Sequence, residues 1–133
     1  MKNLVIAALV VGLASLLTLE ASARIRNNAD PKLAHMVFFG LKDHSKESVD
    51  KFIASCEKYL ANHEDCVYFS IGTRADDVEE PVSVKDFDVA LHVVFANKAG
   101  KEKYLKSERH DKFVAENKDD FAIVRVFDSY LKD

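Results

Sequence analysis

Two segments of this sequence have the composition of β-strands, and the side chains that would point to either face are mostly apolar. This restricts the folds open to the chain. The first is Leu33–Leu41 and the second is Phe87–Ala96. The two faces of the first segment carry His35, Val37, Phe39 and Leu41, and Met36, Phe38 and Gly40. The second has one wholly apolar face, while the other face includes Ala90, His92 and Val94. Strands of this kind need a cover on both sides.

Between these strands the sequence predicts one helix, one further strand and a long connection. Ser45 is placed to cap a helix whose apolar stripe consists of Val49, Phe52, Ile53, Cys56 and Leu60. A polar turn over residues 62–65 ends this helix, and Cys66–Thr73 alternates as the next strand. The acidic connection Arg74–Asp86 is longer than a usual hairpin loop, so it is either a pocket rim or a mobile loop. Its charges favour a solvated surface over a cation site.

After the third strand we expect Asn97 to cap a short helix that ends near Leu105, and a second helical segment to begin near His110. Phe121–Leu131 reads as the last strand. The order β-α-β-β-α-β predicts an α+β fold, the ferredoxin-like sandwich, with a four-stranded antiparallel sheet and helices on one face. Because helices on one face leave the other uncovered, we expect two copies to pair through their sheets as a dimeric α/β barrel.

The first 23 residues have the layout of a secretory signal peptide. Lys2 precedes an apolar run from Leu4 to Leu19, and Ala21-Ser22-Ala23 offers a cleavage site before Arg24. The alternative is an uncleaved anchor, but a spanning helix needs roughly 20 apolar residues and this run is shorter. We therefore expect export to the periplasm or the medium, a flexible lead-in over residues 24–32, and a folded domain over residues 33–133 that is not held at a membrane.

The composition argues against several partners. Removing Lys2 and Glu20 with the leader keeps the net charge at −3, and the basic residues form no patch typical of nucleic-acid binding. Cys56 and Cys66 are either a disulfide, which an oxidising compartment would permit, or two separate thiols. Two cysteines without a nearby histidine pair do not predict a zinc site, and the few glycines predict no phosphate loop. We expect no bound metal or cofactor.

Candidate chemistry centres on Tyr104 and His110, which flank the expected helix break. An imidazole can take a proton near neutral pH, and a phenol can donate a hydrogen bond to a substrate oxygen. Asp128 could orient a histidine, and His35 needs a polar partner if its apolar face is buried. We expect His92 to be structural or at the dimer interface. The two histidines in polar turns, His44 and His63, are expected at the solvated surface.

The sequence resembles the stress-responsive dimeric α/β-barrel family, known as Dabb, in an exported bacterial form. The resemblance covers about residues 33–131 and rests on segments in a shared order: His35–Phe39, Phe69–Gly72, Phe87–Leu91 with Phe95, Tyr104–His110 and Val126–Asp128. It implies the dimer of ferredoxin-like units described above.

The resemblance also implies site residues. One plant member of the family is a polyketide cyclase whose pocket lies between sheet and helices, and its residues match Tyr104, His110, His35 and Asp128. A further pocket histidine of that enzyme falls on Val89, and its His-Pro pair is replaced by Ser107-Glu108. Three hypotheses follow: a homodimer that binds a small apolar molecule, a lyase or cyclase with His110 as base and Tyr104 as hydrogen-bond donor, and a non-catalytic structural or stress-related dimer.

Overall fold

The structure is a computed structural model that describes residues 30–132. The predicted signal peptide over residues 1–23 lies outside this range, as does the lead-in up to residue 29. Within residues 30–132, no helix combines the length and the apolar character needed to cross a membrane.

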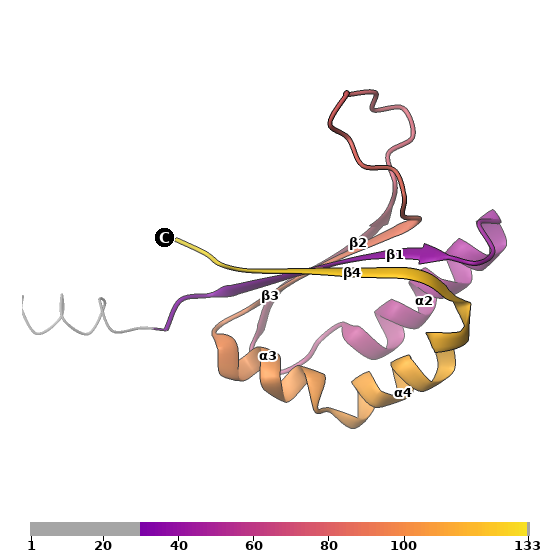
Figure 1. Cartoon of the computed structure of the whole chain (residues 1–133). Coiled ribbons are helices and arrows are strands. Elements are labelled where there is room, and N and C mark those ends of the chain that lie inside the picture. Colours follow the sequence, from indigo (N-terminus) through magenta and orange to yellow (C-terminus); the bar gives the residue numbers. More distant parts are fainter. Residues whose placement is uncertain (1–29, 133) are drawn as a thin grey trace, which may run out of the picture. The chain divides into compact units, whose positions relative to one another are not determined.

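Four strands and three helices follow one another in the predicted order (Figure 1). Their bounds are β1 Leu33–Leu41, α2 Lys46–Leu60, β2 Cys66–Thr73, β3 Val89–Phe95, α3 Lys98–Leu105, α4 Glu108–Asn117, the 3-10 turn η1 Lys118–Asp120 and β4 Phe121–Tyr130. The strands form one sheet in the order β2-β3-β1-β4, and every neighbouring pair is antiparallel. All three helices lie on one side of the sheet. The predicted α+β ferredoxin-like fold is confirmed.

Three side-chain caps explain where the helices begin. Ser45 accepts a hydrogen bond from the backbone N–H of Ser48, and Asn97 accepts one from Gly100, as the sequence predicted. Ser107 accepts one from His110 and starts α4 at Glu108. The expected helix start near His110 was therefore wrong by about one half-turn. His110 lies in the first turn of α4, beside its cap.

The third strand, in contrast, begins later than expected, at Val89 in place of Phe87. The preceding residue, Asp88, is buried, and its carboxylate accepts a hydrogen bond from the backbone N–H of Leu41 at 2.8 Å. Asp88 is thus tied by its side chain to the end of β1, and the regular strand starts only at the next residue.

The core lies between the sheet and the helices and contains a group of packed aromatic rings. The Phe39 ring on β1 lies 4.9 Å from Phe52 on α2 and 6.2 Å from Phe113 on α4, measured between centroids. Phe121 closes the group at the start of β4, 5.5 Å from Phe39. These contacts hold α2 and α4 against one face of the sheet. The helix α3 covers the same face nearer its other end (Figure 1).

The other face of the sheet has no helix over it (Figure 1). Phe38 on β1 contacts the rings of Phe127 on β4 and His92 on β3, with centroids 5.8 and 6.2 Å apart. Phe127 is 56% exposed and Tyr68 on β2 is 55% exposed. We call this surface the helix-free face. Its apolar character agrees with the sequence, and a single chain leaves it open to solvent.

Candidate functional site

Tyr104 is the centre of a cluster of rings at the α3 end of the core. Only 2% of its surface is exposed. Its ring centroid lies 4.9 Å from His63, 5.0 Å from His110, 5.1 Å from Phe95 and 6.1 Å from His35. The structure thus brings together the predicted residues Tyr104, His110 and His35, and it adds His63.

The hydroxyl of Ser107 joins the two sides of the helix break. It donates a hydrogen bond to the carbonyl of Tyr104 at 2.8 Å and accepts one from the backbone N–H of His110 at 3.2 Å. One small side chain therefore ends α3, starts α4 and fixes the spacing of the Tyr104 and His110 backbones. Arg109 adds a tie to the neighbouring helix, because its guanidinium donates to the carbonyls of Lys58 and Ala61 at the end of α2.

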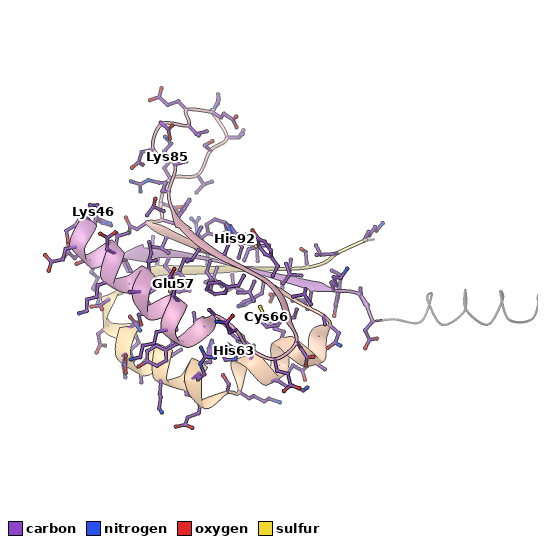
Figure 2. The ribbon with its side chains drawn as sticks, turned by 180° about the vertical axis from the view of Figure 1, so that it is seen from behind. Lys46, Glu57, His63, Cys66, Lys85 and His92 are labelled. Carbon is purple, nitrogen blue, oxygen red and sulfur yellow. The ribbon has the colours of Figure 1, made fainter. Side chains whose placement is uncertain are left out.

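His63 reaches the cluster through a sharply bent turn after α2 (Figure 2). Asn62 and Asp65 adopt left-handed backbone angles, with φ of 57° and 62°. The Nε2 atom of His63 lies 2.8 Å from the carbonyl oxygen of Tyr59. Because a carbonyl only accepts, Nε2 carries the proton and Nδ1 has the lone pair in the neutral ring. The expectation that His63 is a solvated surface residue was wrong.

Asp128 orients His35; the sequence had indicated that Asp128 could orient a histidine, without specifying which one. The two residues face each other in the register of β1 and β4, and His35 Nδ1 lies 2.7 Å from Asp128 Oδ1. Lys101 on α3 pairs with the second carboxylate oxygen. Burial acts to raise the pKa of Asp128, but the hydrogen bonds from Lys101 and His35 outweigh it and the pKa is lowered. The ionised carboxylate holds the proton on Nδ1 of His35, so Nε2 is the acceptor.

Burial also sets the protonation of the cluster. It lowers the pKa of His35 against the opposing effect of Asp128, and it lowers the pKa of His110 against the opposing charge of Asp111. Burial raises the pKa of Tyr104 well above its ordinary value. At neutral pH the phenol of Tyr104 therefore keeps its proton, and burial favours the uncharged rings of His35 and His110 beside it.

The two cysteines are separate free thiols. Cys56 is fully buried on α2, and burial raises its pKa to about 12. Cys66 begins β2 (Figure 2), where its thiol donates to the carbonyl of Tyr68 at 3.2 Å. This arrangement corresponds to the second alternative left open by the sequence. Neither thiol has an activating neighbour that would make it a nucleophile at neutral pH.

An open hollow of about 320 Å³ lies between α3 and β4, beside the cluster. It is lined by Leu33, Lys98, Lys101, Glu102, Leu105, Asp128, Ser129 and Tyr130. Of the four predicted pocket residues, only Asp128 lines it; His35, Tyr104 and His110 do not. Asp128 is therefore the link between this hollow and the buried rings. In the described part of the chain, no group of three or more His, Cys, Asp or Glu side chains could hold a metal ion.

The architecture described above is that of a ferredoxin-like α+β domain. Comparison with known proteins agrees with it. Residues 33–131 match the family described as Stress responsive A/B Barrel Domain, Dabb. The chain belongs to this family. A comparison with curated protein sequences gave no match.

Solved structures share the fold at low sequence identity. A Dabb family protein with a ferredoxin-like fold from Mesorhizobium loti has a TM-score of 0.65 at 20% identity, covering 78% of this chain and all of that one. A dimeric ferredoxin-like protein of unknown function from Thermobifida fusca has a TM-score of 0.65 at 16% identity, covering 77% and 92%. The hydroxynitrile lyase of Passiflora edulis has a TM-score of 0.64 at 19% identity, covering 77% and 95%.

Proposed function

We propose that this chain is an exported, homodimeric Dabb protein that binds a small, largely apolar molecule between the sheet and the helices. The observation that carries the proposal is the buried Tyr104 ring, flanked by His35 and His110, with Asp128 fixing the proton on His35. A cluster of uncharged polar groups inside apolar walls is the usual composition of a small-molecule site.

The chemistry of the cluster indicates the kind of ligand. Tyr104 offers a hydroxyl that keeps its proton, and the neutral ring of His35 offers a lone pair on Nε2. Phe95 and the aliphatic core residues around them favour an apolar body. A neutral aromatic or alicyclic molecule with one hydroxyl or carbonyl group would match both requirements.

Dimer formation is supported by the helix-free face. Phe127 and Tyr68 are more than half exposed there, and an apolar face of this kind is normally covered by a partner. The structurally similar protein from Thermobifida fusca is described as dimeric. A sheet-to-sheet homodimer would cover the face with the same residues from both copies.

Ligand binding can be tested by a fragment screen on the purified chain. The probes are small phenols and cyclic ketones, followed by NMR chemical shifts and thermal shift. We expect hits that move His35 and His110 resonances and that bind at least tenfold more weakly to His110→Ala. His44→Ala is the matched control, because His44 lies in the turn between β1 and α2, its side chain is 72% exposed, and its partner is Asp88 and no residue of the cluster. Equal binding by His110→Ala and the control would remove His110 from the site.

A second candidate function is that of a lyase or cyclase with His110 as general base. The lowered pKa of His110 favours it, since a neutral imidazole can accept a proton at pH 7 while Tyr104 stays a donor. The similar fold of the Passiflora edulis hydroxynitrile lyase suggests cyanide release from a panel of hydroxynitriles as the first assay. Activity should fall at least a hundredfold in His110→Asn. Activity that survives this change would rule out the proposed base.

The non-catalytic alternative has its own signature. If the cluster only stabilises the core, the screen finds no ligand, and Tyr104→Phe changes the unfolding free energy without any effect on binding or turnover.

Export is tested separately by expressing the whole chain in a bacterium and sequencing the N-terminus of the exported protein. The proposal expects it to start at Arg24; retention of the intact chain in the cell would contradict it.

A further inference from the structure

The connection between β2 and β3, residues 74–88, extends away from the sheet on the side opposite the helices. Figure 1 and Figure 2 show this from two directions: the helices lie below the sheet and the connection rises above it. It thus stands on the same side as the helix-free face, where the proposed second copy would pack. We call this segment the β2–β3 arm.

The tip of the arm is a turn that exposes apolar side chains. The backbone N–H of Ser83 donates to the carbonyl of Glu80 at 2.9 Å, so Pro81 and Val82 occupy the centre of the turn. Val82 is 85% exposed and Val84 is 58% exposed. Turn positions usually hold Gly, Pro, Asn, Asp or Ser, whose backbone preferences suit a turn, and Val is not among them. Two valines here are costly in a solvated loop and favourable in a contact.

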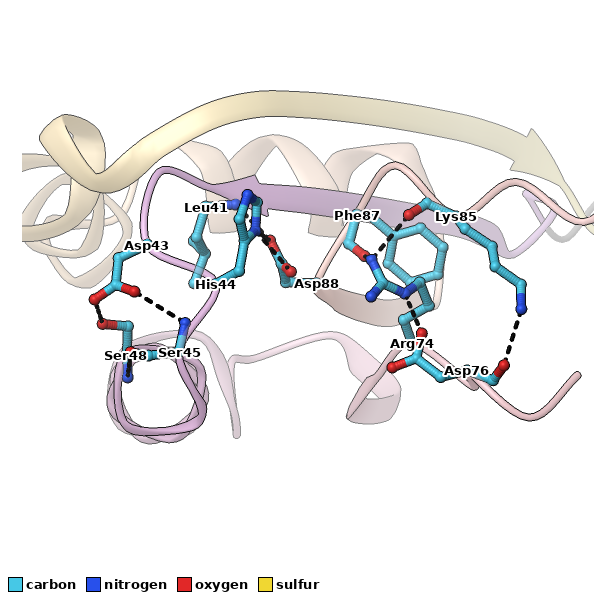
Figure 3. Close-up of polar contacts among 10 residues, drawn as sticks. All are labelled: Leu41, Asp43, His44, Ser45, Ser48, Arg74, Asp76, Lys85, Phe87 and Asp88. Atoms are coloured by element: carbon cyan, nitrogen blue, oxygen red, sulfur yellow. Dashed lines mark hydrogen bonds and ion pairs between the residues drawn. The ribbon is translucent and has the colours of Figure 1, made fainter.

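The neck of the arm is held in one conformation by Arg74 (Figure 3). Its guanidinium donates to the carbonyls of Lys85 and Phe87 at 2.8 and 2.9 Å, and it pairs with the carboxylate of Asp76. The ammonium of Lys85 donates back to the carbonyl of Asp76 at 2.9 Å. These cross-links join the segment that leaves β2 to the segment that returns to β3. An arm ordered in advance loses less conformational entropy when it binds a partner.

The base of the arm is continuous with the helix-free face. Phe87 packs on Phe38, with centroids 5.0 Å apart, and Phe38 in turn contacts Phe127 on β4. Asp86 forms an ion pair with Arg125, which projects from β4 on the same face. Ring contacts therefore link the edge strand β4 through β1 to the root of the arm, with the Asp86–Arg125 ion pair on the same face.

From these contacts we infer that the β2–β3 arm contacts the second copy of this chain and extends the dimer interface beyond the sheet. This inference rests on the proposed homodimer. Two-fold symmetry would give the dimer two arms, each reaching the partner with Val82 and Val84. The acidic residues of the arm remain at the rim of the interface, where charges stay hydrated.

The test is the dimer dissociation constant of the purified chain, measured by sedimentation at several concentrations. The arm variant is the double substitution Val82→Ser and Val84→Ser. Val114→Ser is the matched control, since Val114 is an exposed valine on α4, on the helix side of the sheet. We expect the arm variant to weaken the dimer at least tenfold and the control to leave it unchanged. Amides of residues 76–84 should also exchange hydrogen more slowly in the dimer than after dilution to monomer.

Two results would overturn the inference, and they can be told apart. If the wild-type chain dimerises and Phe127→Asp weakens the dimer while the arm variant does not, the homodimer stands and the arm has no part in it. If the wild-type chain is monomeric at micromolar concentration, the homodimer itself fails and the arm loses its partner. Circular dichroism checks that every variant keeps its fold.

Discussion

The two faces of the sheet have similar apolar patterns, but helices cover only one of them (Figure 1). Each face contains a histidine from a central strand: His35 on the helix side and His92 on the helix-free side. His35 is 5% exposed and bonded to Asp128, whereas His92 is half-buried and contacts Ser70 Oγ at 3.2 Å. The helices exclude water from one face and thereby perturb its titrating groups, while the helix-free face is open to solvent in a single chain. An apolar pattern shows that a face is to be covered, but only the cover determines its chemistry.

The largest contrast between the faces is expected from Phe to Ala substitutions. Phe52 is 3% exposed and packs against Phe39. We expect Phe52→Ala to lower the unfolding free energy by about 3–5 kcal/mol, because it removes a core ring and leaves a cavity. Phe127→Ala deletes the same atoms on the helix-free face. Urea unfolding below the dimer dissociation constant should show a loss under about 1 kcal/mol for it. Similar losses for both variants would contradict the contrast.

The next effect concerns association. Phe127→Asp places a carboxylate in the proposed sheet-to-sheet contact, and we expect the dimer dissociation constant to rise by about 100-fold, or about 2.7 kcal/mol. Val114→Asp adds the same charge on the helix side and should leave dimer formation unchanged. Sedimentation at a series of concentrations measures both. An undiminished dimer in Phe127→Asp would show that the helix-free face is not the interface.

A smaller effect is expected from the cap between α3 and α4. Ser107→Ala removes the acceptor for His110 N–H, so the unfolding free energy should fall by about 1 kcal/mol. Ser45→Ala removes the corresponding cap of α2 and should cost a similar amount. Only the first change should shift the NMR titration of His110, and Ser107→Thr should restore it. A shift in both alanine variants would mean that the cap acts through general loosening.

The smallest effect is expected from a modest drop in pH. Folding lowers the pKa of His35 and His110 by burial, so below the ordinary value of 6.5 the unfolded chain binds more protons than the folded one. Stability should therefore decrease as the pH falls from about 7 to 6. Urea midpoints over this range measure the slope, which His110→Asn should reduce. A midpoint that rises on acidification would contradict the stated direction.

Alternation and capping made the fold readable from the sequence. The bounds of β1 and β2 follow directly from alternation between polar turns, and Ser45 and Asn97 are caps at the expected places. The pairing of His35 with Asp128 was also foreseeable, since the ferredoxin-like order brings the first and last strands together. These features depend on local pattern and topology.

Less of the site could be predicted from the sequence, because its details depend on the backbone conformation of two turns. Ser107 has no Glu or Gln at the third helical position, where His110 stands, so the usual capping-box signature is missing. His63 lies among polar residues, in a turn where Asn62 and Asp65 adopt left-handed angles. Asn and Asp tolerate such angles, which is the one hint that the sequence contained.

The position of β1 between β3 and β4 has a consequence for the newly made chain. Its partner β4, Phe121–Tyr130, is the last of the four strands to be synthesised. Until then, the apolar strand that becomes the centre of the sheet has one open edge. A chain truncated before Phe121 would keep that edge permanently and could pair with other unfinished copies. The order of synthesis thus makes the last strand the step that protects the first one from aggregation.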